Sequence, residues 1–196
     1  MKIKFLLLIL LFTSEFIHAQ SFNAGIRFGI VGSQVNGDQL TGFNKAGFVA
    51  GGYVKRKFSD VISLQMEIVY IQKGSRKPTD MYNSYYLMRL GYIEVPLNVL
   101  FHVAKKVDLT AGPSFGTLIA SEEKDEYGTY TNAEPFEKFE LSYNFGLIYQ
   151  LSDNWSFDGR YSHSLMTIRP FPGTSSTFFD KGQYNVVIEF SLLYGF

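Results

Sequence analysis

The last stretch of the chain, residues 183–196, alternates between two kinds of side chain. Every second position is apolar or aromatic, and polar or small residues such as Asn185 and Ser191 lie among the positions between. The apolar row consists of Tyr184, Val186, Ile188, Phe190, Leu192, Tyr194 and Phe196. A period of two is the period of a β-strand. Because chain ends usually fray unless a sheet holds them, we expect this strand to be paired up to Phe196.

This terminal strand resembles the closing strand of an outer-membrane β-barrel. The resemblance implies that its last apolar residues form the signal by which the barrel-assembly machinery recognises the chain. These residues are Phe190, Leu192, Tyr194 and Phe196. The resemblance also implies that the apolar row contacts outer-membrane lipid.

The N-terminus has the order of parts found in a signal peptide. Lys2 and Lys4 precede an apolar run at residues 5–12, and Ala19 precedes Gln20. The run is shorter than the about twenty apolar residues of a membrane-spanning helix and falls within the roughly 7–15 residues of a signal core. We therefore expect residues 1–19 to be removed and residues 20–196 to form an outer-membrane β-barrel domain.

Composition narrows the classes of protein further. The chain has no cysteine, so disulfides and thiolate metal sites are excluded. Its 18 Lys and Arg residues balance 18 Asp and Glu residues, and such a chain has no strong field that would attract nucleic acid. Apart from the leader it has no long apolar run, which excludes a helical membrane protein. We expect no nucleic-acid partner.

Seven further segments alternate with the same period. The expected strands are residues 21–33, 46–58, 62–70, 84–103, 109–119, 139–151, 155–165 and 183–196. The connections between them are alternately long and short, with the long loops at residues 34–44, 74–83, 121–137 and 169–182. This is typical of an even-stranded barrel whose termini and short turns face the periplasm. The sequence therefore predicts an all-β fold, an eight-stranded antiparallel up-and-down transmembrane β-barrel.

Two of these strands carry irregular features. In residues 46–58, Phe48 and Val49 compete for the apolar face and two glycines allow a bend, so the facing of this strand stays open. In residues 84–103, Pro96 lacks a backbone N–H. We expect either a bulge at Pro96 or a pairing that tolerates the missing donor.

A soluble ligand-binding barrel in the periplasm would also alternate, but with its apolar side inward. Two features favour the membrane. Strands of about a dozen residues exceed the roughly nine to eleven that cross a bilayer at a tilt, and aromatic residues such as Tyr70, Trp155 and Tyr194 recur near strand ends, where interfacial girdles lie. We therefore expect the mature chain in the cell outer membrane.

Three short motifs resemble one family. They are the runs Gly-Tyr-Ile-Glu-Val-Pro-Leu at residues 91–97, Leu-Thr-Ala-Gly-Pro at residues 109–113 and Arg-Tyr-Ser at residues 160–162. With these motifs the chain is similar to the PorT-like outer-membrane β-barrel domain family, a porin-like group of small exported barrels. One branch of that family is tied to a protein-secretion apparatus, but a likeness of fold does not carry that role over.

Polar residues on the minority face of the strands would point into the lumen if the apolar row faces lipid. They are Arg27, Glu67, Glu94, Asn98, Glu140, Asp158, Arg160 and Glu189. An eight-stranded barrel is just wide enough for side chains to fill its interior. The sequence therefore predicts a network of ion pairs that satisfies these buried groups, with a narrow polar conduit as the alternative. Lys55 and Lys57 are candidates for the missing positive charge.

A catalytic site is not indicated. Asp158, Ser162 and Ser164 share a face, but His163 points to the opposite one and cannot take a proton from either serine. We interpret His163, and likewise His102 at a strand end, as interfacial residues. Neither a phosphate-binding loop nor metal-ligand spacing occurs. We expect no enzymatic activity and no cofactor.

The acidic loop at residues 121–137 contains Tyr127, and exposed aromatic residues are favoured at interfaces. We therefore expect a small barrel with a filled lumen whose role is structural or partner-binding through its extracellular loops. The alternatives are a narrow porin-like channel for small solutes and, as a third class, a soluble periplasmic binding barrel.

Overall fold

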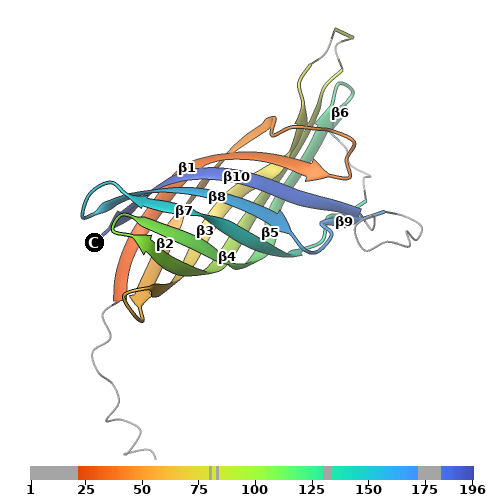
Figure 1. Cartoon of the computed structure of the whole chain (residues 1–196). Coiled ribbons are helices and arrows are strands. Elements are labelled where there is room, and N and C mark those ends of the chain that lie inside the picture. Colours follow the sequence, from red (N-terminus) through yellow and green to blue (C-terminus); the bar gives the residue numbers. More distant parts are fainter. Residues whose placement is uncertain (1–21, 80, 83, 130–133, 172–181) are drawn as a thin grey trace, which may run out of the picture.

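The computed structural model describes residues 22–79, 81–82, 84–129, 134–171 and 182–196 (Figure 1). The expected leader, residues 1–19, lies outside the described residues. Within the described part of the chain, no helix is long and apolar enough to cross a membrane.

The described chain forms one closed sheet of antiparallel strands. The strands are β1 (Phe22–Asn36), β2 (Lys45–Lys57), β3 (Ile62–Lys77), β4 (Tyr86–Ala104), β5 (Val107–Asp125), β6 (Gly128–Thr129), β7 (Phe139–Gln150), β8 (Trp155–Ser164), β9 (Arg169–Pro170) and β10 (Gly182–Gly195). Each long strand pairs with the next along the chain, and β1 pairs with β10 to close the ring. Two strands, β6 and β9, have only two residues and belong to connections. The expected eight-stranded antiparallel barrel is confirmed.

The last strand is paired to its end. Register between β1 and β10 runs from Asn36 opposite Tyr184 to Gly25 opposite Gly195, and the Phe196 N–H donates to the Ala24 carbonyl at 3.0 Å. The seam that joins the two ends of the chain is therefore hydrogen-bonded along its length. The start of β1 and the end of β10 lie beside the short turns, and we call this the turn end of the barrel and the opposite one the loop end.

Alternation separates two faces in every long strand. Large apolar residues point outward, whereas polar residues and a smaller set of apolar ones are buried inside. The facing of β2 is decided by its pairing: Val49, opposite Ile71 of β3, is 1% exposed inside the barrel, and Phe48 and Val54 face outward.

Pro96 does not create a bulge. Met66 opposite Leu97 and Val69 opposite Glu94 belong to the same register, so the β3–β4 ladder continues across the proline. The second expectation, pairing that tolerates the missing N–H, holds. Register shifts in β4 lie elsewhere, between Gly91 and Tyr92 and between His102 and Ala104.

Two expected loops begin later than the pattern indicated. Strand β3 continues to Lys77 and β5 to Asp125, and both end opposite Tyr86 of β4. These strands therefore extend beyond the rest of the ring at the loop end, as Figure 1 shows for β5 and the adjoining β6. The extension lacks the apolar outer row that marked the strands in the sequence, and cross-strand pairing with β4 forms it instead.

Candidate functional site

The interior of the barrel is filled in layers because inward positions of successive strands meet at the same height. An open vestibule lies at the turn end. Above it, Leu100, Ile148 and Leu193 form an apolar ring against which Tyr53 packs. Two groups of buried charges follow, and an apolar cap closes the loop end. The charged layers are the candidate functional centre, since buried charges require specific partners.

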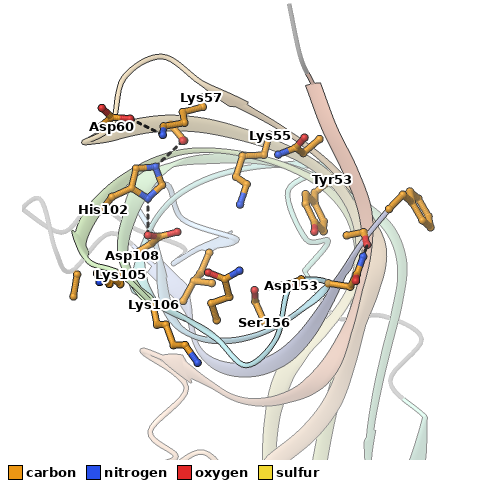
Figure 2. Close-up of a pocket in the computed structure, with 18 residues that line it drawn as sticks. Tyr53, Lys55, Lys57, Asp60, His102, Lys105, Lys106, Asp108, Asp153 and Ser156 are labelled. Carbon is orange, nitrogen blue, oxygen red and sulfur yellow. Dashed lines mark hydrogen bonds and ion pairs between the residues drawn. The ribbon is translucent and has the colours of Figure 1, made fainter.

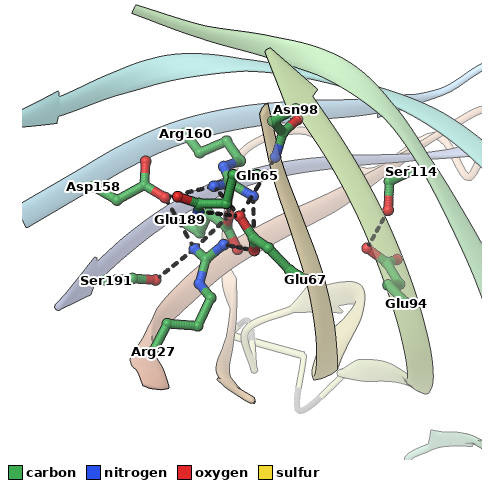
Figure 3. A network of polar contacts seen from close by, with 10 residues as sticks. All are labelled: Arg27, Gln65, Glu67, Glu94, Asn98, Ser114, Asp158, Arg160, Glu189 and Ser191. Carbon is green, nitrogen blue, oxygen red and sulfur yellow. Dashed lines mark hydrogen bonds and ion pairs between the residues drawn. The ribbon is translucent and has the colours of Figure 1, made fainter. Parts of the chain in front are cut away.

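The first charged layer, the arginine cluster, joins Arg27, Arg160, Glu67, Asp158 and Glu189 from four strands (Figure 3). Arg160 Nη2 lies 2.9 Å from Glu67 Oε1 and 2.7 Å from Asp158 Oδ2. Arg27 Nη2 lies 3.0 Å from Glu189 Oε1, and Arg27 Nη1 also donates to Glu67. Glu67 thus receives hydrogen bonds from both guanidinium groups.

Neutral side chains complete this cluster. Gln65 Nε2 donates to Glu67 Oε1 at 2.8 Å, and Ser191 Oγ accepts from Arg27 Nη2 at 2.9 Å. Both arginines stand opposite inward glycines: Arg27 faces Gly51, and Arg160 faces Gly146. A Cβ at Gly146 would come within 3.0 Å of the Arg160 Cα and 3.3 Å of its Cβ, so glycine leaves room for the long side chain.

The second charged layer, the lysine cluster, consists of Lys73, Glu94 and Glu140. Lys73 Nζ lies 2.5 Å from Glu94 Oε1 and 2.8 Å from Glu140 Oε1. Glu140 also accepts from Asn185 Nδ2 at 2.7 Å. Lys73 lies over the Tyr92 ring, 5.2 Å from its centroid, which adds a cation–π contact.

All eight residues of the predicted network lie in the interior, but they form two groups. Glu94 and Glu140 belong to the lysine cluster. The other six are Glu67 and five residues around it, with Asn98 Nδ2 at 3.5 Å from Glu67 Oε1. The central cation Lys73 was missed because β3 was expected to end at Tyr70. Continuing the alternation from Glu67 by six residues would have placed Lys73 on the inner face.

Lys55 and Lys57 do not supply the missing positive charge. Lys55 lines the vestibule, and Lys57 pairs with Asp60 at 2.7 Å in an exposed turn. Donation from the Lys57 ammonium lowers the pKa of Asp60. The expectation was wrong because β2 runs from the loop end to the turn end, so the lysines near its C-terminal end lie below the apolar ring.

The apolar cap closes the lumen at the loop end. Its buried members are Val31, Val35, Val49, Val69, Ile71, Met88, Leu90, Tyr92, Ile168 and Val187. Ile168 comes from the connection after β8 and is held by hydrogen bonds of its N–H to the Gln183 carbonyl and of its carbonyl to the Glu137 N–H, each 2.8 Å. This connection thus contributes a side chain that covers the charged layers.

A further ion pair fastens the same connection. Arg169 Nη2 lies 2.6 Å from Glu123 Oε2, the Tyr86 hydroxyl donates to the other carboxylate oxygen, and the guanidinium lies 3.8 Å from the Phe136 ring centroid. Burial alone would raise the pKa of Glu123, but the hydrogen bonds from Arg169 and Tyr86 outweigh it and hold this pKa below its ordinary value.

The vestibule at the turn end is a cavity of about 570 Å³ (Figure 2). His102 lies in its wall, with Nε2 at 2.8 Å from Ser63 Oγ and Nδ1 at 2.6 Å from Asp108 Oδ1. Interpreting His102 as interfacial was therefore wrong. It lies an even number of residues from Asn98 and Leu100 on the same strand, and its side chain therefore points inward as theirs do.

The other histidine lies on the outer face. His163 stacks on the Tyr143 ring with centroids 5.8 Å apart, while Asp158, Ser162 and Ser164 are buried inside. Among the described residues, no group of three or more His, Cys, Asp or Glu side chains is arranged to hold a metal ion.

The four residues of the predicted assembly signal lie along the outer side of the seam. Phe190 stacks on Phe157 at 6.0 Å between ring centroids, and Tyr194 packs between Trp155 at 5.0 Å and Phe196 at 5.9 Å. Phe196 itself is 79% exposed. Whether these residues are read during assembly stays a prediction.

Comparison with known proteins places the fold. A family model described as "Outer membrane protein beta-barrel domain" matches residues 18–169. The crystal structure of Ail, the attachment invasion locus protein of Yersinia pestis, is similar with a TM-score of 0.53 at 15% identity, covering 89% of this chain and 98% of that one. Neisserial surface protein A is similar with a TM-score of 0.58 at 10% identity, covering 90% and 100%. At these identities the likeness shows the fold alone.

No curated protein matches the chain. The narrower resemblance to the PorT-like group stays a prediction.

Proposed function

The chain belongs to the outer membrane protein beta-barrel domain family, and we propose that it is a closed barrel that presents its extracellular loops to a protein partner. As a small outer-membrane β-barrel, it has its turn end toward the periplasm and its loop end outside. The alternative of a soluble periplasmic barrel is set aside, because the family is one of outer-membrane barrels.

The observation that carries the proposal is the continuous filling of the lumen. Two charged layers and two apolar layers succeed one another between the vestibule and the loop end. A hydrated ion that crosses would have to separate pairs such as Lys73–Glu140 or Arg160–Glu67, which are buried on both sides. Removing one partner of a buried pair costs about 3–5 kcal/mol, so such opening is rare.

The extension of β3, β4 and β5 supports the partner-binding role. It rises beyond the apolar belt and carries charged side chains, with the exposed Tyr127 in the turn after β5. Exposed aromatic rings among charges are typical of protein interfaces. We further propose that the barrel-assembly machinery recognises the chain through the β10 residues named above.

A narrow porin-like channel is the second candidate. Its support is the polar character of the inner wall at Glu67, Glu94 and Arg160, together with a vestibule that already opens part of the lumen. This candidate requires that the charged layers rearrange to admit solutes.

Planar-bilayer recording separates the two candidates. Mature chain that is refolded, and shown to be folded by its altered migration on an unheated gel, should give no steady current steps. Reproducible ion-selective steps would replace the closed-barrel proposal by the channel.

The partner-binding role is tested in cells. A photo-crosslinking residue at Tyr127 should yield a discrete protein adduct, and the same residue at the outward-facing Phe145 serves as the control that contacts lipid. Equal adduct patterns at both positions would count against a partner at the loops.

A further inference from the structure

The wall of the vestibule holds a serine, a histidine and an aspartate in series. Ser63 comes from β3, His102 from β4 and Asp108 from β5. His102 and Asp108 are direct cross-strand partners, because the short turn at residues 105–106 brings β5 back beside β4. Ser63 stands opposite Leu100, two residues from His102 and on the same inward face. Figure 2 shows the contact between His102 and Asp108 at the mouth of the barrel.

The atoms in contact are those that nucleophilic catalysis uses. The Asp108 carboxylate, 2.6 Å from Nδ1, accepts a hydrogen bond from the Nδ1–H, and this tautomer leaves Nε2 as the acceptor for the Ser63 hydroxyl at 2.8 Å. A nucleophile that contacts a base, with the base oriented by a third group, is the arrangement that activates serine in unrelated folds. The arrangement is recognised by geometry and not by sequence position, so its location on three barrel strands does not count against it.

We propose that Ser63, His102 and Asp108 form a hydrolytic site that opens to the periplasm and cleaves small anionic esters. This goes beyond the closed-barrel role. The site lies below the apolar ring of Leu100, Ile148 and Leu193 and does not involve the extracellular loops.

The reaction has two steps, transfer of the acyl group to Ser63 and its hydrolysis by water. Ser63 Oγ bonds to the ester carbonyl carbon while its proton moves to His102 Nε2; the carbon–oxygen bond to the leaving alcohol then breaks, and that alcohol takes the proton from Nε2. In the second step, His102 takes a proton from water, whose oxygen bonds to the acyl carbon. The bond to Ser63 Oγ breaks, Oγ recovers the proton, and a carboxylic acid leaves. Asp108 is a positioning residue that holds the imidazole in the required tautomer.

The cavity indicates the class of substrate. A volume of about 570 Å³ lies within the range of roughly 300–1,000 Å³ found for small-molecule sites. Lys55, Lys105 and Lys106 line it, and in the described part of the chain none of the three has a carboxylate within ion-pair distance. Lys57 differs, because it already forms an ion pair with Asp60. Unpaired ammonium groups favour an ester that carries a carboxylate or phosphate, and they also favour negative charge that develops on the carbonyl oxygen.

The test uses a fluorophosphonate, which reports an activated serine without knowledge of the substrate. Attack by Ser63 Oγ forms a phosphorus–oxygen bond and releases fluoride. The refolded mature chain should gain one adduct, and peptide mass spectrometry should place it on Ser63. Ser63→Ala and His102→Ala should abolish labelling. Ser156→Ala is the matched control, because Ser156 lines the same vestibule and, among the described residues, makes no hydrogen bond to a histidine.

The role of Asp108 is tested by rate. Asp108→Asn should slow labelling by on the order of 10²-fold or more, by analogy with the loss when the aspartate of a triad becomes an amide, and Asp108→Glu should recover part of it. Asp153→Asn, another vestibule aspartate, should label like the parent. Unheated gel migration verifies that each variant is folded. A folded parent that does not label, or labelling that persists in Ser63→Ala, overturns the proposal.

The substrate class is tested with paired p-nitrophenyl esters, one with a carboxylate on the acyl chain and one with a neutral group of similar size. The parent should prefer the charged ester. Replacing Lys55, Lys105 and Lys106 by Gln should raise KM for the charged ester about tenfold and change KM for the neutral ester much less. Equal KM values for the two esters in the parent would contradict the anionic class.

Discussion

The two faces of the barrel wall are built on different principles. On the inner face, the charges of the two clusters have named partners at fixed distances, such as Lys73 between Glu94 and Glu140. On the outer face, apolar side chains such as Phe145 and Ile68 are exposed. A lipid chain can replace an outer contact, whereas only another buried side chain can replace a lost counter-charge. The inner face should therefore tolerate substitution far less than the outer face.

Within the inner face, the two charged layers also differ. The arginine cluster has two cations that share three carboxylates, and Arg27 contacts Glu67, Asp158 and Glu189 as Arg160 does. The lysine cluster has one cation for two carboxylates. Loss of Lys73 therefore leaves Glu94 and Glu140 without a cationic contact in the described part of the chain.

The largest effect is expected for Lys73→Met. Its removal leaves two buried carboxylates facing each other, so the free energy of unfolding in lipid should fall by about 3–5 kcal/mol. Urea titration of refolded barrel measures it. Adding Glu94→Gln and Glu140→Gln to the same chain should restore most of the loss, and a triple variant as unstable as Lys73→Met would contradict the charge explanation.

Arg160→Ala should cost less, about 3 kcal/mol, because Arg27 still contacts all three carboxylates of its cluster. The same titration, run beside Lys73→Met, ranks the two layers. If the two variants were equally unstable, the second arginine would provide no compensation.

Deletion of Phe196 tests whether the outer face at the seam has a specific role in assembly. Loss of interfacial burial alone should reduce stability after refolding by on the order of 1.5–3 kcal/mol. If the terminal residue is read during assembly, the amount inserted in cells should fall much further than that loss explains. The two measurements are the amount of folded barrel in cell membranes and the free energy of unfolding in vitro. Proportionate losses in both would refute the signal role.

Acid should loosen the loop end through Glu123. Because the pKa of Glu123 is lower in the folded chain than in the unfolded one, the stability it contributes is complete above the ordinary glutamate range and is lost as the pH falls through the lowered value. The contribution is about 0.5–1 kcal/mol, since the pair is partly exposed. Glu123→Gln should therefore lose less stability than the parent between neutral and acidic pH, as measured by the unfolding midpoint.

The smallest effect is expected for Phe145→Leu on the outer face. An apolar side chain facing lipid is replaced by another, so the free energy of unfolding should change by about 0.5 kcal/mol or less. A loss as large as that of Arg160→Ala would remove the contrast between the two faces.

Much of this architecture could be predicted from alternation alone. Side-chain direction along a strand follows from local backbone geometry, so the inward facing of Arg27, Glu67, Glu94 and Asp158 could be derived without knowing any neighbour. The number of strands and the closing role of β10 followed from the same period and from the lengths of the connections. The leader lies outside the described residues and stays a prediction.

The alternation could not predict how long each strand is, in which register neighbouring strands pair, or at which level of the barrel each side chain lies. The end of β3 depends on its partner Tyr86 in β4, and for that reason Lys73, between the expected strand and the expected loop, was left out of the predicted network. The facing of β2 depends on Val49 meeting Ile71 across a ladder. The division into two charged layers, and the meeting of Ser63, His102 and Asp108, require the registers of several strands at once. Distances between strands are properties of the closed ring, because each register adds to the next around it, and only the tertiary structure contains that sum.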